Sequence, residues 1–192
     1  MNLENIGNIN NAKSGQEPGV LLMGSNVNRP GLDLKSYAAQ VSEQLNSPWT
    51  KPKTPEEIEN AMRGARAILC LSSDYKKVLA FAKLEYYGVN AAKQVIYEFG
   101  SWIGGNGFGR AVYEGGRDLG AEDYPFARLI AFVRSGNIKA QRIITETGGV
   151  KVGHTPEGKH VYDITRRQQP TETVIIGPGG MWTKERNFQH IV

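Results

Sequence analysis

A run of closely spaced glycines between residues 104 and 109 is the feature of this sequence with the clearest chemical use. The segment reads Gly-Gly-Asn-Gly-Phe-Gly and directly follows an apolar stretch at 94–103. Glycines let backbone N–H groups point toward one centre with no side chain in the way. The N-terminus of a following helix adds partial positive charge. The pattern predicts a cradle for a phosphate group, and a tight surface turn is the alternative.

Two common nucleotide-binding motifs do not fit this loop. A Walker loop has Lys-Ser or Lys-Thr after its last glycine, whereas Gly109 is followed by Arg110 and Ala111. A Rossmann fingerprint needs a parallel strand–helix–strand unit with an acidic residue about 20 positions further on, and the pattern here does not supply one. An oxidoreductase of the Rossmann type is therefore disfavoured.

Two glutamates in apolar strands are candidates for proton transfer. Glu98 interrupts the apolar stretch 95–99, where burial would raise the pKa of its carboxyl toward the range useful for a general base. Glu85, in the stretch 84–87, is the second candidate. The alternative for both is an ordinary solvated residue on the exposed face of a strand.

Other residue types exclude several classes of site. The histidines at 154, 160 and 190 are dispersed, with no helix-spaced pair, so we expect no metal centre. The single cysteine, Cys70, lies in the apolar stretch 68–71. It excludes a disulfide framework and a cysteine-only zinc site, and we expect it to be a small buried hydrophobe.

The whole composition is that of a globular protein. Of 192 residues, 40% are hydrophobic and 22% are charged, with a net charge of +4 and an excess of glycine, 23 in all. The chain has no apolar run long enough for a membrane span and no signal-like N-terminus, so a cytoplasmic location is expected. We expect a flexible arm at 1–17, one domain at 18–170, and a C-terminal extension with an extra strand at 171–192.

The hydrophobic spacing predicts an α+β fold with a mixed, mostly antiparallel sheet flanked by helices. The expected strands are 19–24, 67–72, 77–87, 94–103, 125–133, 150–154, 159–165 and 173–176. The expected helices are 34–45, 110–119, 137–147 and one that begins at Pro55. The last has a capping box, since Thr54 precedes Pro55 and Glu57 stands at the third helical position.

The glycine loop and the segments after it resemble the core of the GNAT superfamily of acyl-CoA N-acyltransferases. The family loop has the form Arg/Gln-x-x-Gly-x-Gly/Ala, and 104–109 matches it at Gly107 and Gly109. Downstream, the segment 137–149 follows the family passage with its asparagine, alanine and glycine. Three positions depart from the family: Gly104 replaces the basic or amide residue, Ile144 replaces a tyrosine, and Gly149 replaces an aromatic residue. The resemblance covers about residues 55–165.

The resemblance implies that acetyl-CoA or another acyl-CoA is the co-substrate, with no metal. Its pyrophosphate would lie on the backbone N–H groups of 105–110, and its thioester beside Phe99 and Gly100, where a main-chain N–H would polarise the carbonyl. Asn137 would contact the CoA arm or cap its helix. The implied binding residues are Phe99, Gly100, Gly104, Gly105, Asn106, Gly107, Phe108, Gly109, Arg110 and Asn137.

The resemblance also assigns catalytic roles. A carboxylate on the third strand would take the amine proton, which selects Glu98 first and Glu85 second. The tyrosine that usually protonates the thiolate is absent at Ile144. Water or another tyrosine would then substitute, and Tyr97 is a candidate together with Tyr86, Tyr87 and Tyr162.

The expected function is transfer of an acetyl or other short acyl group from acyl-CoA to an amine by direct attack on the thioester. One alternative is an enzyme that modifies adenine in DNA, because basic residues at 151, 159, 166, 167, 184 and 186 lie near Trp182 and Phe188. A solvated charged face explains them more simply. A second alternative is a non-catalytic acyl-CoA-binding module. Separately, the strand at 173–176 could pair with a second copy of the chain in a homodimer.

Overall fold

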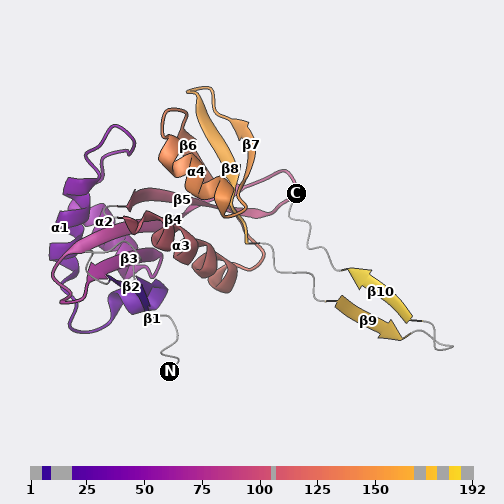
Figure 1. The fold of residues 1–192 in the computed structure, drawn as a ribbon, viewed down its shortest axis with the longest axis horizontal. Coiled ribbons are helices and arrows are strands. Elements are labelled where there is room, and N and C mark those ends of the chain that lie inside the picture. The colour runs from indigo at the N-terminus through magenta and orange to yellow at the C-terminus, as the bar shows by residue number, and fades with distance from the viewer. Residues whose placement is uncertain (1–5, 10–18, 105–106, 167–171, 177–181, 187–192) are drawn as a thin grey trace.

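The computed structural model describes residues 6–9, 19–104, 107–166, 172–176 and 182–186. An eight-stranded sheet runs through the molecule in the order β1-β2-β3-β4-β5-β6-β8-β7 (Figure 1). All its neighbouring strands are antiparallel except β5 and β6. The strands are β1 Ile6–Ile9, β2 Gly19–Met23, β3 Ala67–Ser72, β4 Val78–Val89, β5 Val95–Gly104, β6 Arg128–Arg134, β7 Val150–His154 and β8 Lys159–Asp163.

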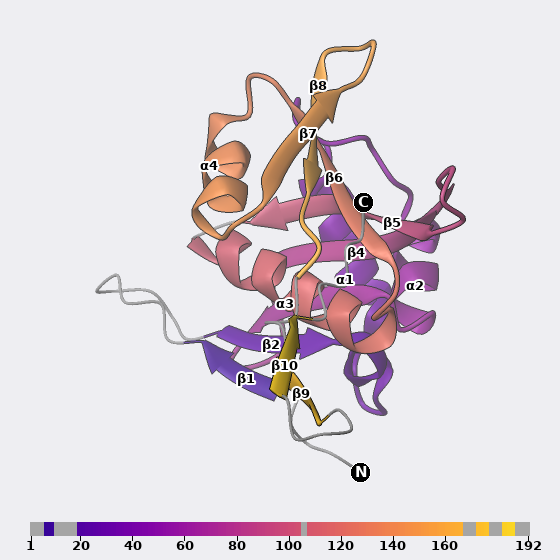
Figure 2. The same ribbon diagram turned by 90° about the vertical axis from the view of Figure 1, so that its right-hand side faces the viewer.

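Helices cover both faces of this sheet and enclose two hydrophobic cores. The helices are η1 Gly24–Asn28, α1 Leu34–Gln44, α2 Pro55–Arg63, α3 Gly109–Asp123 and α4 Ile138–Glu146. One core joins α1 and α2 to β2–β4, and the other joins α3 and α4 to the opposite face. The β7–β8 hairpin and α4 lie at the other end of the molecule from β1 (Figure 2). The predicted α+β class and element order are confirmed.

The helix starts follow the local sequence. Thr54 accepts a hydrogen bond from the backbone N–H of Glu57, and the Glu57 carboxylate accepts one from the N–H of Thr54, which completes the predicted capping box. Asn137 caps α4 by accepting from the N–H of Ala140 at 3.2 Å. These caps fix where the 45–54 loop and the β6–α4 turn end, and both segments border the site described below.

Helix α3 packs unusually close to the sheet because glycines line its inner face. A Cβ on Gly116 would lie 2.4 Å from the ring of Phe99, and one on Gly120 would lie 2.5 Å from Leu129. Gly115 faces Met23 in the same way. The glycines that weaken the helical signal in the sequence therefore allow the close approach that holds α3 against β5 and β6.

Strands β5 and β6 pair over only three residues and then separate. Their parallel ladder ends at Glu98 and Ile130, although β5 continues to Gly104 and β6 to Arg134. In this region β5 also contains a bulge against β4, where Ser101 adopts a left-handed backbone with φ of +53°. The separation leaves an opening between the two strands at the centre of the sheet. The bulge changes the direction of the β5 backbone beside this opening.

The ends of the chain differ partly from expectation. Residues 6–9, inside the expected flexible arm, pair with β2 as strand β1, because the edge of β2 offers free backbone groups. The other arm residues lie outside the described part. The expected strand at 173–176 is present within β9 Glu172–Ile176, which pairs with β10 Trp182–Arg186 in a separate two-stranded sheet. None of the described helices is long and apolar enough to cross a membrane.

Candidate active site

Two adjoining cavities occupy the opening between β5 and β6. The loop cavity, about 430 Å³, lies between the end of β5, the start of α3 and one side of α4. The strand cavity, about 380 Å³, lies along the separated parts of β5 and β6. The two cavities share five lining residues: Trp49, Thr50, Trp102, Asn137 and Ala140. They therefore form one continuous cleft whose wall opposite α4 is the loop between α1 and α2.

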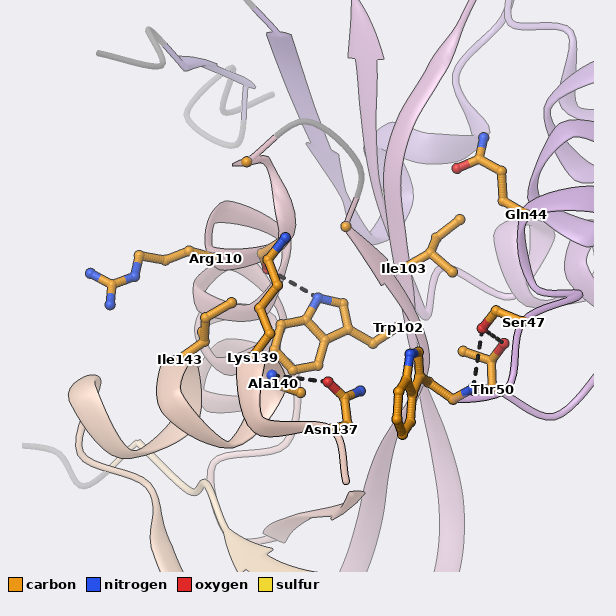
Figure 3. Close-up of a pocket in the computed structure, with 14 residues that line it drawn as sticks. Gln44, Ser47, Thr50, Trp102, Ile103, Arg110, Asn137, Lys139, Ala140 and Ile143 are labelled. Atoms are coloured by element: carbon orange, nitrogen blue, oxygen red, sulfur yellow. Dashed lines mark hydrogen bonds between the residues drawn. The ribbon is translucent and has the colours of Figure 1, made fainter. Parts of the chain in front are cut away.

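Two glycines, Gly104 and Gly109, make a close backbone contact at the base of the loop cavity. A Cβ on Gly104 would lie 2.3 Å from the Cα of Gly109, so the two ends of the loop touch backbone to backbone. The indole Nε1–H of Trp102 donates to the carbonyl of Gly109 at 3.0 Å and holds this closure (Figure 3). The glycine at 104, which replaces the basic or amide residue of the GNAT pattern, is thus required by the tight closure.

The first residues of α3 line the loop cavity. Phe108 precedes the helix and provides no side-chain cap, so none of the described side chains satisfies the first N–H groups of α3. Gly107, with φ of +88°, and Gly109 line the cavity here. Arg110 lines it too and pairs with Glu146. This arrangement suits a phosphate group.

The other loop residues predicted to bind the co-substrate are Gly105, Asn106 and Phe108. Gly105 and Asn106 lie outside the described residues. Phe108, predicted to contact the co-substrate, is only 2% exposed and packs in the core beside Gly19. Its large apolar side chain is buried as the hydrophobic effect favours, which leaves only its backbone for a ligand.

Glu98 and Glu85 face each other in the strand cavity. They are direct cross-strand partners on β5 and β4, so their side chains share one face of the sheet. The Glu85 carboxylate forms an ion pair with Lys83, with an N–O distance of 2.8 Å, and the Lys83 side chain is almost completely buried. This hydrogen bond lowers the pKa of Glu85, so Glu85 stays ionised and committed to Lys83.

The environment of Glu98 acts in the opposite direction. Burial raises the pKa of its carboxyl, and the negative charge of Glu85 raises it further, against the weaker effects of Lys159, Lys83 and Lys53. The carboxyl forms no ion pair with any described residue. Gly100 lies beside it, since a Cβ there would lie 3.2 Å from Glu98 Oε1. A half-buried carboxylate with a raised pKa has the properties of a general base.

The backbone after Glu98 borders the strand cavity. Phe99, Gly100 and Ser101 line the strand cavity, and the bulge at Ser101 interrupts the ladder there. Phe99 itself anchors this stretch, because its ring packs on Tyr113 and Trp102. The predicted positions of Phe99 and Gly100 at the cleft are thus consistent with the geometry.

On α4, Figure 3 shows Asn137, Lys139, Ala140 and Ile143 along one side of the loop cavity, across from Gln44, Ser47 and Thr50. Its dashed lines mark the cap on Ala140 and the hydroxyl contact of 2.8 Å between Ser47 and Thr50. Asn137 lines both cavities while it caps its helix, so its side-chain oxygen is already engaged.

Several solved structures have a fold similar to that of this chain. The chain aligns with an acetyltransferase of the GNAT family from Bacillus anthracis at a TM-score of 0.50 and 15% identity, covering 75% of this chain and 91% of that one. It aligns with a chain of the NatC complex bound to Gag peptide and CoA at 0.56 and 7%, covering 77% and 96%. It aligns with Arabidopsis thaliana NAA60, in complex with a bisubstrate analogue, at 0.51 and 11%, covering 70% and 94%.

The chain has the GNAT fold. This confirms the fold expected from the loop and the 137–149 segment. No protein-family model matches the sequence, and no curated protein matches it either. The described residues also contain no cluster of histidine, cysteine and carboxylate side chains that could hold a metal ion.

The two departures from the GNAT sequence pattern at Ile144 and Gly149 are related, because the two residues are in contact. Ile144 is fully buried, and a Cβ on Gly149 would lie 2.4 Å from its Cγ2 atom. The isoleucine methyl therefore fills the space beside residue 149, and no larger side chain fits there. Neither residue lines either cavity.

Tyr97 is not part of the site, contrary to the prediction. Its side chain lies on the face of β5 opposite Glu98 and stacks on Tyr124 with ring centroids 4.0 Å apart. Side chains alternate along a strand, so residues 97 and 98 cannot both face the cleft. The other tyrosines named as substitutes, Tyr86, Tyr87 and Tyr162, line neither cavity.

Several residues of the site carry no signal in the sequence. Trp49 and Thr50 reach the cleft from the α1–α2 loop, and Trp102 crosses it from β5. Lysines and an arginine from three elements complete the strand cavity. Trp49 keeps 49% of its surface exposed, which marks it as a candidate contact only once the structure is known.

Proposed function

We propose that this protein transfers an acyl group from acyl-CoA to an amine. The observation that carries the proposal is the cleft where β5 and β6 separate, with the glycine loop at one end and Glu98 at the other. The GNAT fold supports it, because the similar structures include one bound to CoA and peptide and one with a bisubstrate analogue.

The loop cavity is suited to the CoA end. The free N–H groups at the start of α3 and the cations Arg110 and Lys139 provide partners for phosphate oxygens. The pantetheine arm would then run along the separated strands toward Phe99 and Gly100. This orientation brings the thioester carbon into the strand cavity.

The strand cavity supplies the chemistry. Glu98 removes a proton from the attacking ammonium, directly or through water, and the neutral amine forms a bond to the thioester carbon. The carbon–sulfur bond breaks, and CoA leaves as a thiolate. Backbone N–H groups at the bulge stabilise the oxyanion. The nitrogen releases its remaining excess proton to water as the amide forms, and water protonates the thiolate, because no tyrosine of the described chain lines the cleft.

Calorimetry with acetyl-CoA tests the binding half of this proposal. The folded protein should bind acetyl-CoA, and absence of heat at millimolar acetyl-CoA would contradict it. A thiol-release assay across a panel of amines tests the catalytic half. Binding without any amine-dependent release would favour the non-catalytic alternative, which the buried Ile144 at the usual tyrosine position motivates.

A further inference from the structure

The strand cavity carries more positive than negative charge. Four cationic side chains line it from three elements, and two glutamates oppose them. The cations are Lys51 and Lys53 from the α1–α2 loop, Arg134 from the end of β6, and Lys159 from the start of β8. Excess charge in an enclosed site attracts a ligand of opposite sign.

The ion pairs of the site leave three of these cations without a partner. Lys53 pairs with Glu57 at 3.1 Å. Glu85 is committed to Lys83. Among the described residues, Lys51, Arg134 and Lys159 form no ion pair, and Glu98 is the other carboxylate that lines the cavity. The strand-cavity end of the cleft, where the acceptor amine would bind in the proposed function and which we call the acceptor end, therefore has cations without an ion-pair partner among the described residues.

Arg134 and Lys159 are direct cross-strand partners in the β6–β8 ladder. Side chains at such positions project from the same face of a sheet, and like charges placed opposite each other destabilise the pairing. A neutral or opposite-charge pair would be more stable there. The juxtaposition is explained if an anionic group of a ligand lies between the two side chains.

The size of the cavity limits what such a ligand can be. The indole of Trp49 reaches from the α1–α2 loop to the β6–α4 turn, where a Cβ on Gly136 would lie 3.2 Å from its ring. This contact bridges the cleft near the acceptor end. The volume of about 380 Å³ lies in the range of pockets that hold a small molecule.

We propose that the acceptor is a small amine that carries a carboxylate or phosphate group, with the anionic group bound by Arg134, Lys159 and Lys51 and the amine beside Glu98. The inference rests on the proposed function and names the substrate class of the same site. Carboxylate and phosphate share the chemistry that these cations recognise.

Initial rates with acetyl-CoA and four matched amines test the class of acceptor. The probes are 2-aminoethyl phosphate, β-alanine, ethanolamine and ethylenediamine. The two anionic amines should give kcat/KM values at least about tenfold above the other two. The better of the two identifies phosphate or carboxylate as the preferred group. Equal or faster turnover of ethanolamine or ethylenediamine would overturn the inference.

Two variants that each remove one lysine charge distinguish binding of the anionic group by Lys159 from an effect of the net charge of the protein. Lys159→Gln should raise KM for the preferred anionic amine about tenfold and change kcat little. Lys151→Gln is the matched control, because Lys151 is exposed on β7 and lines neither cavity. Lys159→Gln should not lower the Tm, since it removes the repulsion with Arg134. Identical KM values for the two variants would contradict the role of Lys159.

Binding measurements distinguish failure of this inference from failure of the proposed function. Calorimetry with the preferred anionic amine and no acetyl-CoA should show binding that Lys159→Gln weakens. If acetyl-CoA binds and is consumed with neutral amines alone, the acceptor class is wrong and acyl transfer stands. If acetyl-CoA does not bind and no anionic amine binds, both are wrong.

Discussion

Glu98 and Glu85 show how neighbouring positions separate the properties of two identical carboxyl groups. Both lie on one face of the β4–β5 pair. Lys83 lowers the pKa of Glu85, whereas burial and the charge of Glu85 raise the pKa of Glu98. Such opposed shifts mark acid–base assignments in enzyme sites. The charge of Glu85 therefore acts on the pKa of Glu98, and we expect this effect to appear in the pH dependence of activity.

Replacing Glu98 by Gln should move activity and stability in opposite directions. Loss of the base should lower kcat/KM about 10²- to 10⁴-fold, with acetyl-CoA affinity unchanged. A raised carboxyl pKa means that the folded state binds the proton more tightly, so stability is lost as pH rises through that pKa. The variant should therefore be more stable than the natural protein at neutral pH, as urea unfolding would measure. Unchanged kcat/KM would remove Glu98 from the mechanism.

Replacing Glu85 by Gln should shift the acid limb of the pH–rate profile. Glu98 must be deprotonated to act, so activity rises with pH through its pKa. Without the Glu85 charge that pKa falls, and the limb should move to lower pH. Profiles of kcat/KM for the natural protein and the variant measure this shift. A limb that does not move would show that Glu85 does not act on Glu98 in solution.

The role of Glu98 as a candidate could be predicted from sequence because a charge in an apolar strand stands out locally. Tyr97 was predicted wrongly, since alternation along β5 places it on the other face. The pairing of Arg134 with Lys159 depends on the register of two strands 25 positions apart. No local pattern encodes such a register.

Among the elements, α3 depends most on its glycines. Gly116→Ala places a methyl group 2.4 Å from the Phe99 ring, so the helix must move away from β5. We expect a loss of about 1–3 kcal/mol in the free energy of unfolding from overpacking, although alanine favours helices by about 1 kcal/mol. Gly153→Ala on β7 is the control, because nothing lies within 4 Å of its added methyl. Equal stability of the two variants would contradict the close packing.

The closed glycine loop makes a second prediction for this element. Gly104→Ala cannot keep the contact with Gly109, because its Cβ would overlap the Cα there. The loop must open, which displaces the N–H groups at the start of α3. Acetyl-CoA affinity should fall at least about tenfold, by calorimetry, with Gly153→Ala unchanged. Retained affinity would show that the loop does not bind the phosphates.

The order of the elements was predictable and their contacts were not. Hydrophobic spacing and the Thr54 capping box are local, so the strands and helices up to residue 165 follow from them. The bulge at Ser101 and the separation of β5 from β6 arise from competition between ladders with β4, β6 and β8. The strand at 6–9 depends on the free edge of β2, which a four-residue segment among Asn and Gly residues does not reveal.

For the whole molecule, the cleft is lined by segments from both halves of the chain, namely the α1–α2 loop, β5, β6 and α4. Bound acetyl-CoA would contact the α1–α2 loop, β5, β6 and α4 together and should stabilise them as a unit. At 100 times its Kd, a ligand adds about 2.7 kcal/mol, which corresponds to a Tm rise of roughly 5–10 °C for a chain of this size. Thermal scans with and without acetyl-CoA measure it. An unchanged Tm at saturating acetyl-CoA would contradict binding to the folded state.

The single cysteine gives the molecule a built-in reporter. Cys70 on β3 is fully buried in the core that α3 forms with the sheet, and burial raises the pKa of its thiol to about 12. Because only the thiolate reacts with thiol reagents, the folded protein should add no background to an assay that detects released CoA. The same reagent should react with one thiol per chain once β3 leaves the sheet, so its rate of labelling without substrate measures the opening of the core.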